Sequence, residues 1–153
     1  MSEKNKISIM KENRTMLEKR FFKENKIDEE LRERIINIIK SHLSDKDDVI
    51  FAYLHGSFAE SGRFRDIDLA IFMRKPGREI EIESDFSYEL TEKTGYPVEV
   101  RIINKASVAF QMAVLRKGRL LLSREDDVRT DFIEDVGRRY RVYSHFRNIV
   151  LGI

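Results

Sequence analysis

The apolar positions of this chain first follow a helical period and then a strand-like one. Asp28 suits the N-cap of a helix, and the residues after it recur at a spacing of three or four. The face that this spacing predicts to be buried consists of Leu31, Ile35, Ile38, Ile39 and His42, with His42 at its edge. A short apolar run follows at 49–54 and ends at Gly56, which predicts a buried strand rather than a long helix.

The second half of the chain continues to alternate between strands and helices. A strand is predicted at 66–73, and Pro76 and Gly77 then break the chain. Ile82, Phe86 and Leu90 share the face of a following helix, which Gly95 closes as a C-cap. The remaining predicted elements are a strand at 97–103, a helix at 106–117 closed by Gly118, a strand at 119–122 and a helix from about 125. This order predicts an α/β fold of the α+β type, with a small mixed β-sheet and helices packed on one side.

The 153 residues suit a single domain with three parts. We expect N-terminal helices at about 1–45, a core at about 48–123 and a C-terminal helix at about 124–153. Residues 1–26 hold eight Lys or Arg and four Glu, and Met10, Leu17 and Phe21 there share a helical face. This pattern favours a surface helix with one packed stripe over an arm that binds nucleic acid.

The C-terminal segment carries arginines that nearby acids match, as in a solvated, ion-paired helix. Its aromatic residues are Phe132, Tyr140, Tyr143 and Phe146. They suit packing onto the sheet or onto another protein, and we favour internal packing for most of them.

The composition excludes several classes of mechanism. The chain has no cysteine, so disulfides, thiolate nucleophiles and cysteine-based zinc sites are excluded. Its three histidines are too far apart in sequence for metal-ligand spacing. A net charge of +2 does not favour direct nucleic-acid binding. No stretch approaches the roughly 20 apolar residues of a membrane span, and the polar N-terminus lacks a signal core, so we expect a cytoplasmic protein.

The residues that point to chemistry lie just after the first predicted strand and on the second. Gly56 and Ser57 form a turn whose backbone N–H groups and hydroxyl suit phosphate oxygens. Asp66 and Asp68 lie on one face of the next strand because side chains alternate along a strand. Two such carboxylates repel each other, and a divalent cation such as Mg²⁺ arriving with a triphosphate would compensate them.

A third acid, Glu99, is predicted on a later strand. If Val98 and Val100 face the core, Glu99 faces away from it, beside Arg101. There it would bind a second metal ion or take the proton of an attacking hydroxyl. Taken alone, Gly-Ser is usually a turn, Asp-x-Asp is polar alternation and the Glu99–Arg101 pair is an exposed ion pair. It is their order along the chain that favours a metal and nucleotide site.

This order resembles the DNA polymerase β superfamily, and within it the minimal nucleotidyltransferase (MNT) group, whose members are often paired with HEPN proteins. Gly56, Ser57, Asp66 and Asp68 match the pattern of Gly-Ser, a spacer and Asp-hydrophobic-Asp. The resemblance extends over about 50–123. It departs from the family at Glu99, where aspartate is usual, and at Arg65, where many relatives have serine.

The resemblance implies a nucleotidyltransferase fold and transfer of AMP from ATP to a hydroxyl of a protein partner, as an MNT antitoxin acting on a HEPN toxin. It implies catalytic and metal-binding roles for Asp66, Asp68 and Glu99, with two Mg²⁺ ions. Gly56, Ser57 and Arg65 would bind the nucleotide, although an ion pair with an acid is slightly favoured for Arg65. The alternatives are transfer to a small molecule and a non-catalytic module that neutralises its partner by binding it. Assembly with itself or with another chain stays open.

Overall fold

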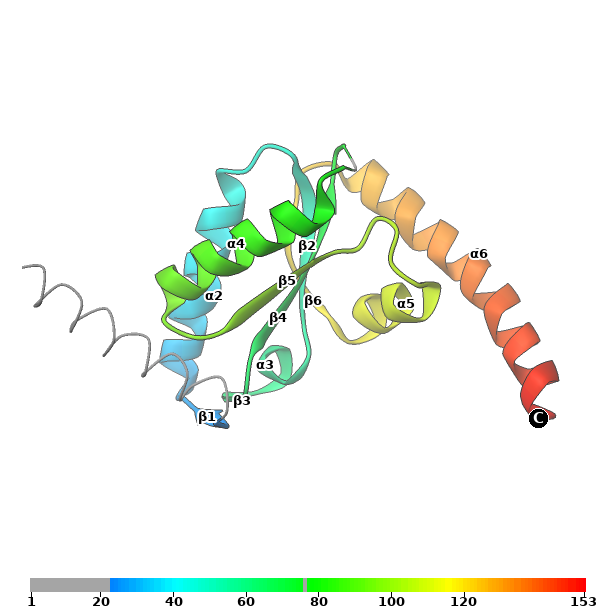
Figure 1. The fold of residues 1–153 in the computed structure, drawn as a ribbon, viewed down its shortest axis with the longest axis horizontal. Coiled ribbons are helices and arrows are strands. Elements are labelled where there is room, and N and C mark those ends of the chain that lie inside the picture. The colour runs from blue at the N-terminus through cyan, green and yellow to red at the C-terminus, as the bar shows by residue number, and fades with distance from the viewer. Residues whose placement is uncertain (1–22, 76) are drawn as a thin grey trace, which may run out of the picture.

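A computed structural model describes residues 23–75 and 77–153 of the chain (Figure 1). Its main sheet has four strands in the order β5 (Val98–Ile102), β4 (Ile67–Met73), β2 (Val49–His55) and β6 (Arg119–Ser123). β4 and β5 run parallel, whereas β2 is antiparallel to both β4 and β6. The predicted α/β fold with a small mixed sheet is therefore confirmed, as are its four strands.

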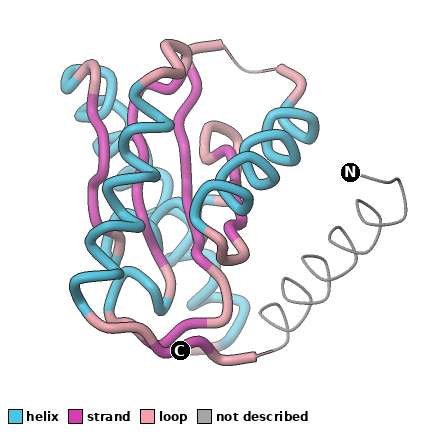
Figure 2. The backbone as a smooth tube through the Cα atoms, turned by 90° about the vertical axis from the view of Figure 1, so that its left-hand side faces the viewer, coloured by secondary structure: helices cyan, strands magenta, loops and turns pink. Residues whose placement is uncertain are grey.

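Helices lie on both faces of this sheet. α2 (Glu29–Ser44) and α4 (Glu79–Thr94) cover one face, and Figure 2 looks onto that side. α5 (Val108–Lys117) and α6 (Asp126–Leu151) pack on part of the opposite face. The expectation of helices on one side describes α2 and α4, while α5 and α6 add a second, smaller core. The rest of that second face carries polar side chains near the ends of the strands.

α2 begins where the sequence predicts it. The carboxylate of Asp28 accepts a hydrogen bond from the N–H of Leu31 at 2.8 Å, which caps the helix. The predicted buried face is slightly rotated, because Ile36 is fully buried and Ile38 is exposed. The edge position expected for His42 is wrong: its ring is buried, 2.9 Å from both Glu89 and Lys93 of α4. Those neighbours are distant in sequence, so the period of α2 alone could not reveal them.

Strand β5 lies at the edge of the sheet, and α4 covers its free backbone groups. The N–H groups of Val98, Val100 and Ile102 donate to side chains of α4 at 2.9 to 3.0 Å. The accepting side chains, one turn apart on α4, are Thr91, Ser87 and Glu83. Edge strands expose such groups to unwanted pairing, and here a helix satisfies them. α4 is thereby fixed in register with β5.

Two short strands and one helical turn join α2 to the sheet. β1 (Asn25–Lys26) pairs with β3 (Arg63–Phe64), and α3 (Ser57–Glu60) follows β2. The N-terminal segment predicted as helical to residue 26 therefore ends in a strand, because its last residues pair with a distant segment. Met10, Leu17 and Phe21 lie outside the described residues.

Arg32 ties α2 to the turn after β2. Its side chain is 5% exposed and donates to the carbonyl groups of Phe58 and Ala59 at 2.8 and 2.6 Å. It also pairs with Glu29 at 2.8 Å. A buried guanidinium with these partners satisfies carbonyls that would otherwise have no donor. α2 therefore positions the segment that directly follows Gly56.

α6 is an ion-paired helix over part of its length, with Asp126 beside Arg129 and Asp135 beside Arg138 and Arg139. The expectation that most of its aromatic residues pack internally is wrong. Phe132 is buried against Phe51, but Tyr143 and Phe146 are exposed, because the C-terminal half of α6 extends beyond the sheet (Figure 1). Among the described helices, none is long and apolar enough to cross a membrane.

The contacts of Arg32 predict a large loss of stability when it is replaced. Arg32→Leu leaves the Phe58 and Ala59 carbonyls without their donor and should lower the free energy of unfolding by about 2–4 kcal/mol. Arg34→Leu changes an exposed arginine on the same helix and should stay within about 0.5 kcal/mol of the wild type. Urea unfolding followed by circular dichroism measures both; equal effects of the two changes would contradict the role of Arg32.

Candidate active site

The three predicted acids meet at one end of the sheet, on the face opposite α2 and α4. Asp66 immediately precedes β4, Asp68 lies within it, and Glu99 is the direct neighbour of Asp68 on the parallel strand β5. One carboxylate oxygen from each of the three lies within 4.8 Å of the others. The valines beside Glu99 are buried, as predicted, and Glu99 is exposed. Parallel pairing of two strands thus places all three acids together.

Gly56 leaves room for this cluster. Its φ is +72°, a conformation that side chains other than glycine rarely adopt. A Cβ atom built on Gly56 would overlap the Oδ2 atom of Asp68. The backbone of the turn therefore runs directly against the Asp68 carboxylate. The Gly-Ser turn and the acids, which are separate in the sequence, form one site.

Ser57 begins the single turn of α3 just after Gly56. Backbone N–H groups at the start of a helix mostly have no partner within it and can donate to an anion. Here the N–H of Ala59 donates to the Gly56 carbonyl at 3.2 Å, so those of Ser57 and Phe58 are the ones suited to this role. Arg65 is exposed, and no ion pair involves it within residues 23–75 and 77–153. The ion pair slightly favoured for Arg65 is thus not observed. Roles for Ser57 and Arg65 in nucleotide binding stay predictions.

The electrostatics of the cluster centre on Asp68. Burial, followed by the negative charges of Asp66 and Glu99, raises the pKa of its carboxyl group from 3.8 to about 6. Arg101 acts in the opposite direction. Because desolvation and like charges both disfavour the carboxylate, the charged form of this site needs a cation.

His55 is a neighbour of the acids that the sequence did not single out. It ends β2 directly opposite Asp68, and its ring meets Phe110 of α5 edge-on at 5.4 Å. Burial, and next the charge of Arg101, lower the pKa of His55. The guanidinium of Arg101 lies 4.1 Å from the centre of the Phe110 ring. The position of His55 beside the acids follows from the register of β2 against β4, and register is not readable from the sequence.

The residues present fit a magnesium ion. Octahedral Mg²⁺ with oxygen ligands at about 2.1 Å holds those oxygens roughly 3–4 Å apart. One carboxylate oxygen each of Asp66, Asp68 and Glu99 lies within 4.8 Å of the others, which is close to this spacing. Because residue 56 is a glycine, no Cβ atom occupies the space next to the Asp68 carboxylate. Hard carboxylate oxygens are the ligands that Mg²⁺ prefers.

The raised pKa of Asp68 predicts that the folding stability of the metal-free protein depends on pH. Because the folded state binds this proton more tightly than the unfolded state, stability is lost as the pH rises from about 4 through about 6. Asp68→Asn removes this loss of folding stability. In EDTA at pH 7.5 the substitution should raise the melting temperature by about 2–4 °C, and the gain stays small because solvent screens the charges. The gain should shrink as the pH is lowered toward 5.

Differential scanning calorimetry measures this dependence. Asp85→Asn, at an exposed aspartate of α4, is the control and should change nothing between pH 5 and 7.5. A destabilised Asp68→Asn variant at pH 7.5 would contradict the account of the site.

Several solved structures of similar fold come from toxin–antitoxin complexes. One match is a chain from the complex of the tri-AMPylated Shewanella oneidensis HEPN toxin with MNT antitoxin. The TM-score is 0.66 and the sequence identity 19%, and the match covers 79% of this chain and 96% of that chain. A toxin–antitoxin with AMP-PNP gives a TM-score of 0.67 at 21% identity, over 76% of this chain and 95% of that chain. An MntA–HepT complex gives a TM-score of 0.60 at 16% identity, covering 82% and 97%. At these identities the likeness establishes the fold alone.

Sequence comparison identifies the family. No curated protein matches the chain at a significant level. The family model described as "Polymerase beta, Nucleotidyltransferase" matches residues 33–127, which is more than half of the chain. The match contains Gly56, Ser57 and the three clustered acids. This chain belongs to the polymerase beta family of nucleotidyltransferases.

Proposed function

We propose that this protein transfers AMP from Mg²⁺-bound ATP to a hydroxyl group on a HEPN-type partner protein, as an MNT-type antitoxin. The observation that carries the proposal is the cluster of Asp66, Asp68 and Glu99, built against the backbone of Gly56. The cluster brings together a cation site and a turn suited to phosphate. Family membership supports nucleotidyl transfer as the reaction.

In the proposed reaction, the acceptor oxygen forms a bond to the α-phosphorus of ATP. The bond from this phosphorus to the oxygen that bridges to the β-phosphate breaks, and pyrophosphate leaves. The acceptor proton passes to a base, and Glu99, which is exposed at the edge of the cluster, is the candidate. Mg²⁺, when bound, neutralises the triphosphate and stabilises the entering and leaving oxygens. Gly56 and Ser57 hold the phosphates through backbone N–H groups and a hydroxyl.

One similar structure supports a protein as the acceptor, and another supports an adenine nucleotide as the donor. One of the matched complexes contains a HEPN toxin that carries three AMP groups, and another contains AMP-PNP. In this chain the acids lie on a face that α5 and α6 cover only in part, so a hydroxyl on the surface of another protein can approach them. Added AMP gives a partner bulk and negative charge, which would inactivate a site that binds RNA.

The alternatives stay open to experiment. A module that neutralises its partner without catalysis would need the fold but not the acids. Transfer to a small molecule would need a site that recognises one. Both alternatives predict a partner whose mass does not change.

The proposal predicts a gain of whole AMP units on the partner. The full chain is incubated with Mg²⁺-ATP and a purified HEPN-type toxin, and the toxin is weighed by mass spectrometry. Asp66→Asn removes a proposed metal ligand and should lower the rate of transfer at least about a hundredfold, as expected for loss of charge stabilisation at the reacting phosphate. Removal of Mg²⁺ by EDTA should abolish the mass gain.

Two glycine variants test the turn at Gly56 and Ser57, which we call the phosphate turn. Gly56→Ala should displace the Asp68 carboxylate and lower transfer, whereas Gly137→Ala adds a methyl group in open space on α6 and should leave transfer unchanged. Neutralisation of the partner by the wild-type chain without any mass gain would favour the binding-only module. Full activity of Asp66→Asn would refute the proposed site.

A further inference from the structure

The C-terminal half of α6 carries an exposed apolar stripe where the helix extends beyond the sheet (Figure 1). Val142, Phe146 and Ile149 follow one another at spacings of four and three residues, which aligns them on one face of the helix. Their exposed fractions are 58%, 60% and 62%. The exposed apolar residues that widen the stripe are Tyr143, Val150 and, just after the C-cap at Gly152, Ile153. Contiguous exposed patches of this kind mark interaction surfaces in soluble proteins.

The stripe continues the face by which the first half of α6 packs. Val136 is fully buried in the second core, and steps of seven residues lead from it to Tyr143 and Val150. Residues seven apart lie nearly on the same side of an α-helix. One side of the helix is therefore covered by the sheet and α5 in its first half and exposed in its second half.

The last contacts between α6 and another element lie at residues 139 and 140. Arg139 donates a hydrogen bond to Gln111 of α5 at 2.8 Å, and the guanidinium of Arg116 lies 4.8 Å from the centre of the Tyr140 ring. Within residues 23–75 and 77–153, no later residue of α6 makes a hydrogen bond, ion pair or ring contact with another element. The stripe is thus accessible to a second chain along its length.

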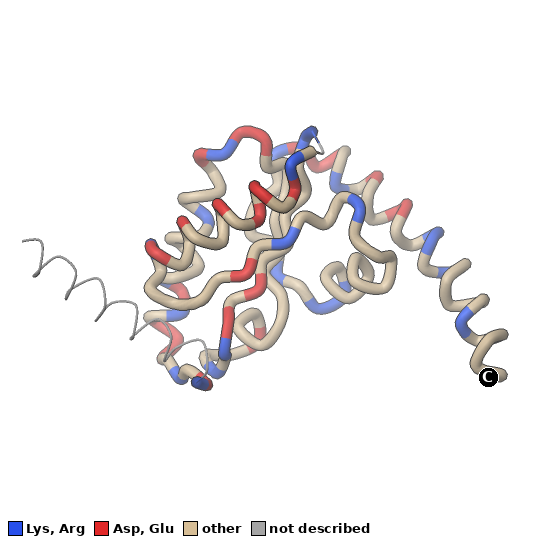
Figure 3. The backbone as a smooth tube through the Cα atoms, viewed as in Figure 1, with Lys and Arg blue, Asp and Glu red and all other residues tan. Residues whose placement is uncertain are grey.

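The charges of α6 are separated along its length (Figure 3). Its five acids lie between residues 126 and 135, and four of its five arginines lie between residues 138 and 147. Parallel pairing of two copies would place these arginines side by side, which is unfavourable. Antiparallel pairing separates them and brings Arg138, Arg139 and Arg141 near the C-terminal end of the other helix. That end carries the negative pole of the helix dipole and attracts cations.

One antiparallel register covers the whole stripe. When Val142 of one copy lies opposite Ile153 of the other, Phe146 lies opposite Ile149, and the two-fold axis repeats both contacts. None of these positions is charged, so the stripe can pack against its own copy without burying an unpaired charge. The paired length lies beyond the contacts of α6 with α5, so pairing does not displace them.

We propose that the C-terminal half of α6 is a dimer interface, in which a second copy of this chain pairs antiparallel through Val142, Phe146, Ile149 and Ile153. The paired length is about 17 Å, from 1.5 Å per residue. Because this contact is smaller than a standard protein interface, the dimer should have a dissociation constant of about 1–100 µM.

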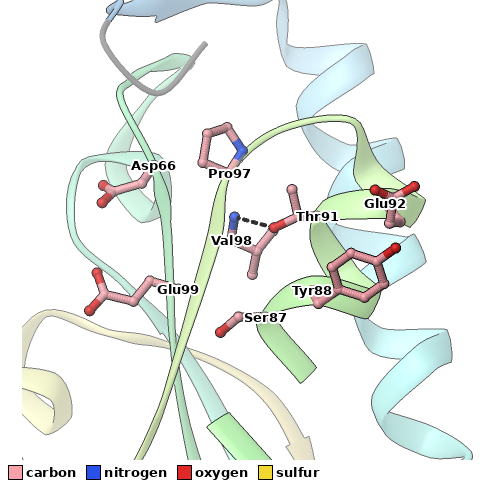
Figure 4. A pocket seen from close by; sticks show the side chains of 8 residues that line it. All are labelled: Asp66, Ser87, Tyr88, Thr91, Glu92, Pro97, Val98 and Glu99. Carbon is pink, nitrogen blue, oxygen red and sulfur yellow. Dashed lines mark hydrogen bonds between the residues drawn. The ribbon is translucent and has the colours of Figure 1, made fainter. Parts of the chain in front are cut away.

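The interface and the candidate active site use different parts of the fold. Asp66 and Glu99 border a cleft whose other lining residues come from α4, Pro97 and Val98 (Figure 4). No residue of α6 lines this cleft. Changes in the stripe should therefore leave Mg²⁺-ATP affinity unchanged, and the dimer proposal does not depend on the proposed function.

Analytical ultracentrifugation of the full chain over about 1–300 µM measures the dimer. The wild type should pass from monomer toward dimer over this range. Phe146→Ser and Ile149→Ser should each raise the dissociation constant at least about tenfold, because each removes a large apolar side chain from the contact. Leu151→Ser is the matched control: Leu151 is 63% exposed but lies on the opposite side of the helix, and its replacement should leave the dissociation constant unchanged.

Engineered cysteines test the antiparallel register, since the chain has no cysteine of its own. Val142→Cys alone and Ile153→Cys alone should stay monomeric on oxidation, because like residues lie about 17 Å apart along the paired helices, too far for a disulfide. An equal mixture of the two variants should form a covalent dimer. Cross-linking of Val142→Cys with itself would indicate parallel pairing and contradict the proposed arrangement.

A wild-type chain that stays monomeric at about 300 µM would overturn the proposal. A lower melting temperature of monomeric Phe146→Ser would then show that the stripe is covered from within the same chain, whereas an unchanged melting temperature would leave the stripe for another protein. Equal effects of Leu151→Ser and Phe146→Ser on the dissociation constant would show that the dimer does not form through the stripe, and would also overturn the proposal.

Discussion

The mutual repulsion of three carboxylates is the constraint on which the arrangement of this molecule depends. Asp66, Asp68 and Glu99 are brought together by the parallel pairing of β4 with β5, although burial and like charge disfavour the ionised form of Asp68. A fold selected only for stability would separate these acids or neutralise them. The unfavourable energy of holding three carboxylates together is consistent with a site in which a bound cation balances their charge.

The surrounding structure serves to hold these charges close. Gly56 brings the backbone of the phosphate turn against Asp68, and Arg32 holds the segment after that turn through buried hydrogen bonds. On the other side, α4 fixes the edge strand that carries Glu99 by accepting hydrogen bonds from its backbone. The site is thus supported from α2 on one flank and from α4 on the other. Such support is what keeps reacting groups in a productive geometry.

Local patterns predicted most of the elements, because caps, turns and side-chain alternation depend on neighbouring residues. Asp68 and Glu99 were each assigned to the correct strand and face by alternation alone. What the sequence could not show is which distant segments meet. The burial of His42 depends on α4, and the position of His55 beside Asp68 depends on the register of β2. The packing of α5 and α6 on the second face is likewise set by tertiary contacts.

The central claim is that the three acids bind the cation that accompanies a nucleoside triphosphate. Crystals of the full chain grown with Mn²⁺ and AMP-PNP test it directly through the anomalous scattering of manganese. The account predicts at least one manganese peak within about 2.5 Å of carboxylate oxygens from Asp66, Asp68 and Glu99, with the phosphates at Gly56 and Ser57. Manganese and phosphates bound elsewhere, with these carboxylates left without a cation, would contradict it.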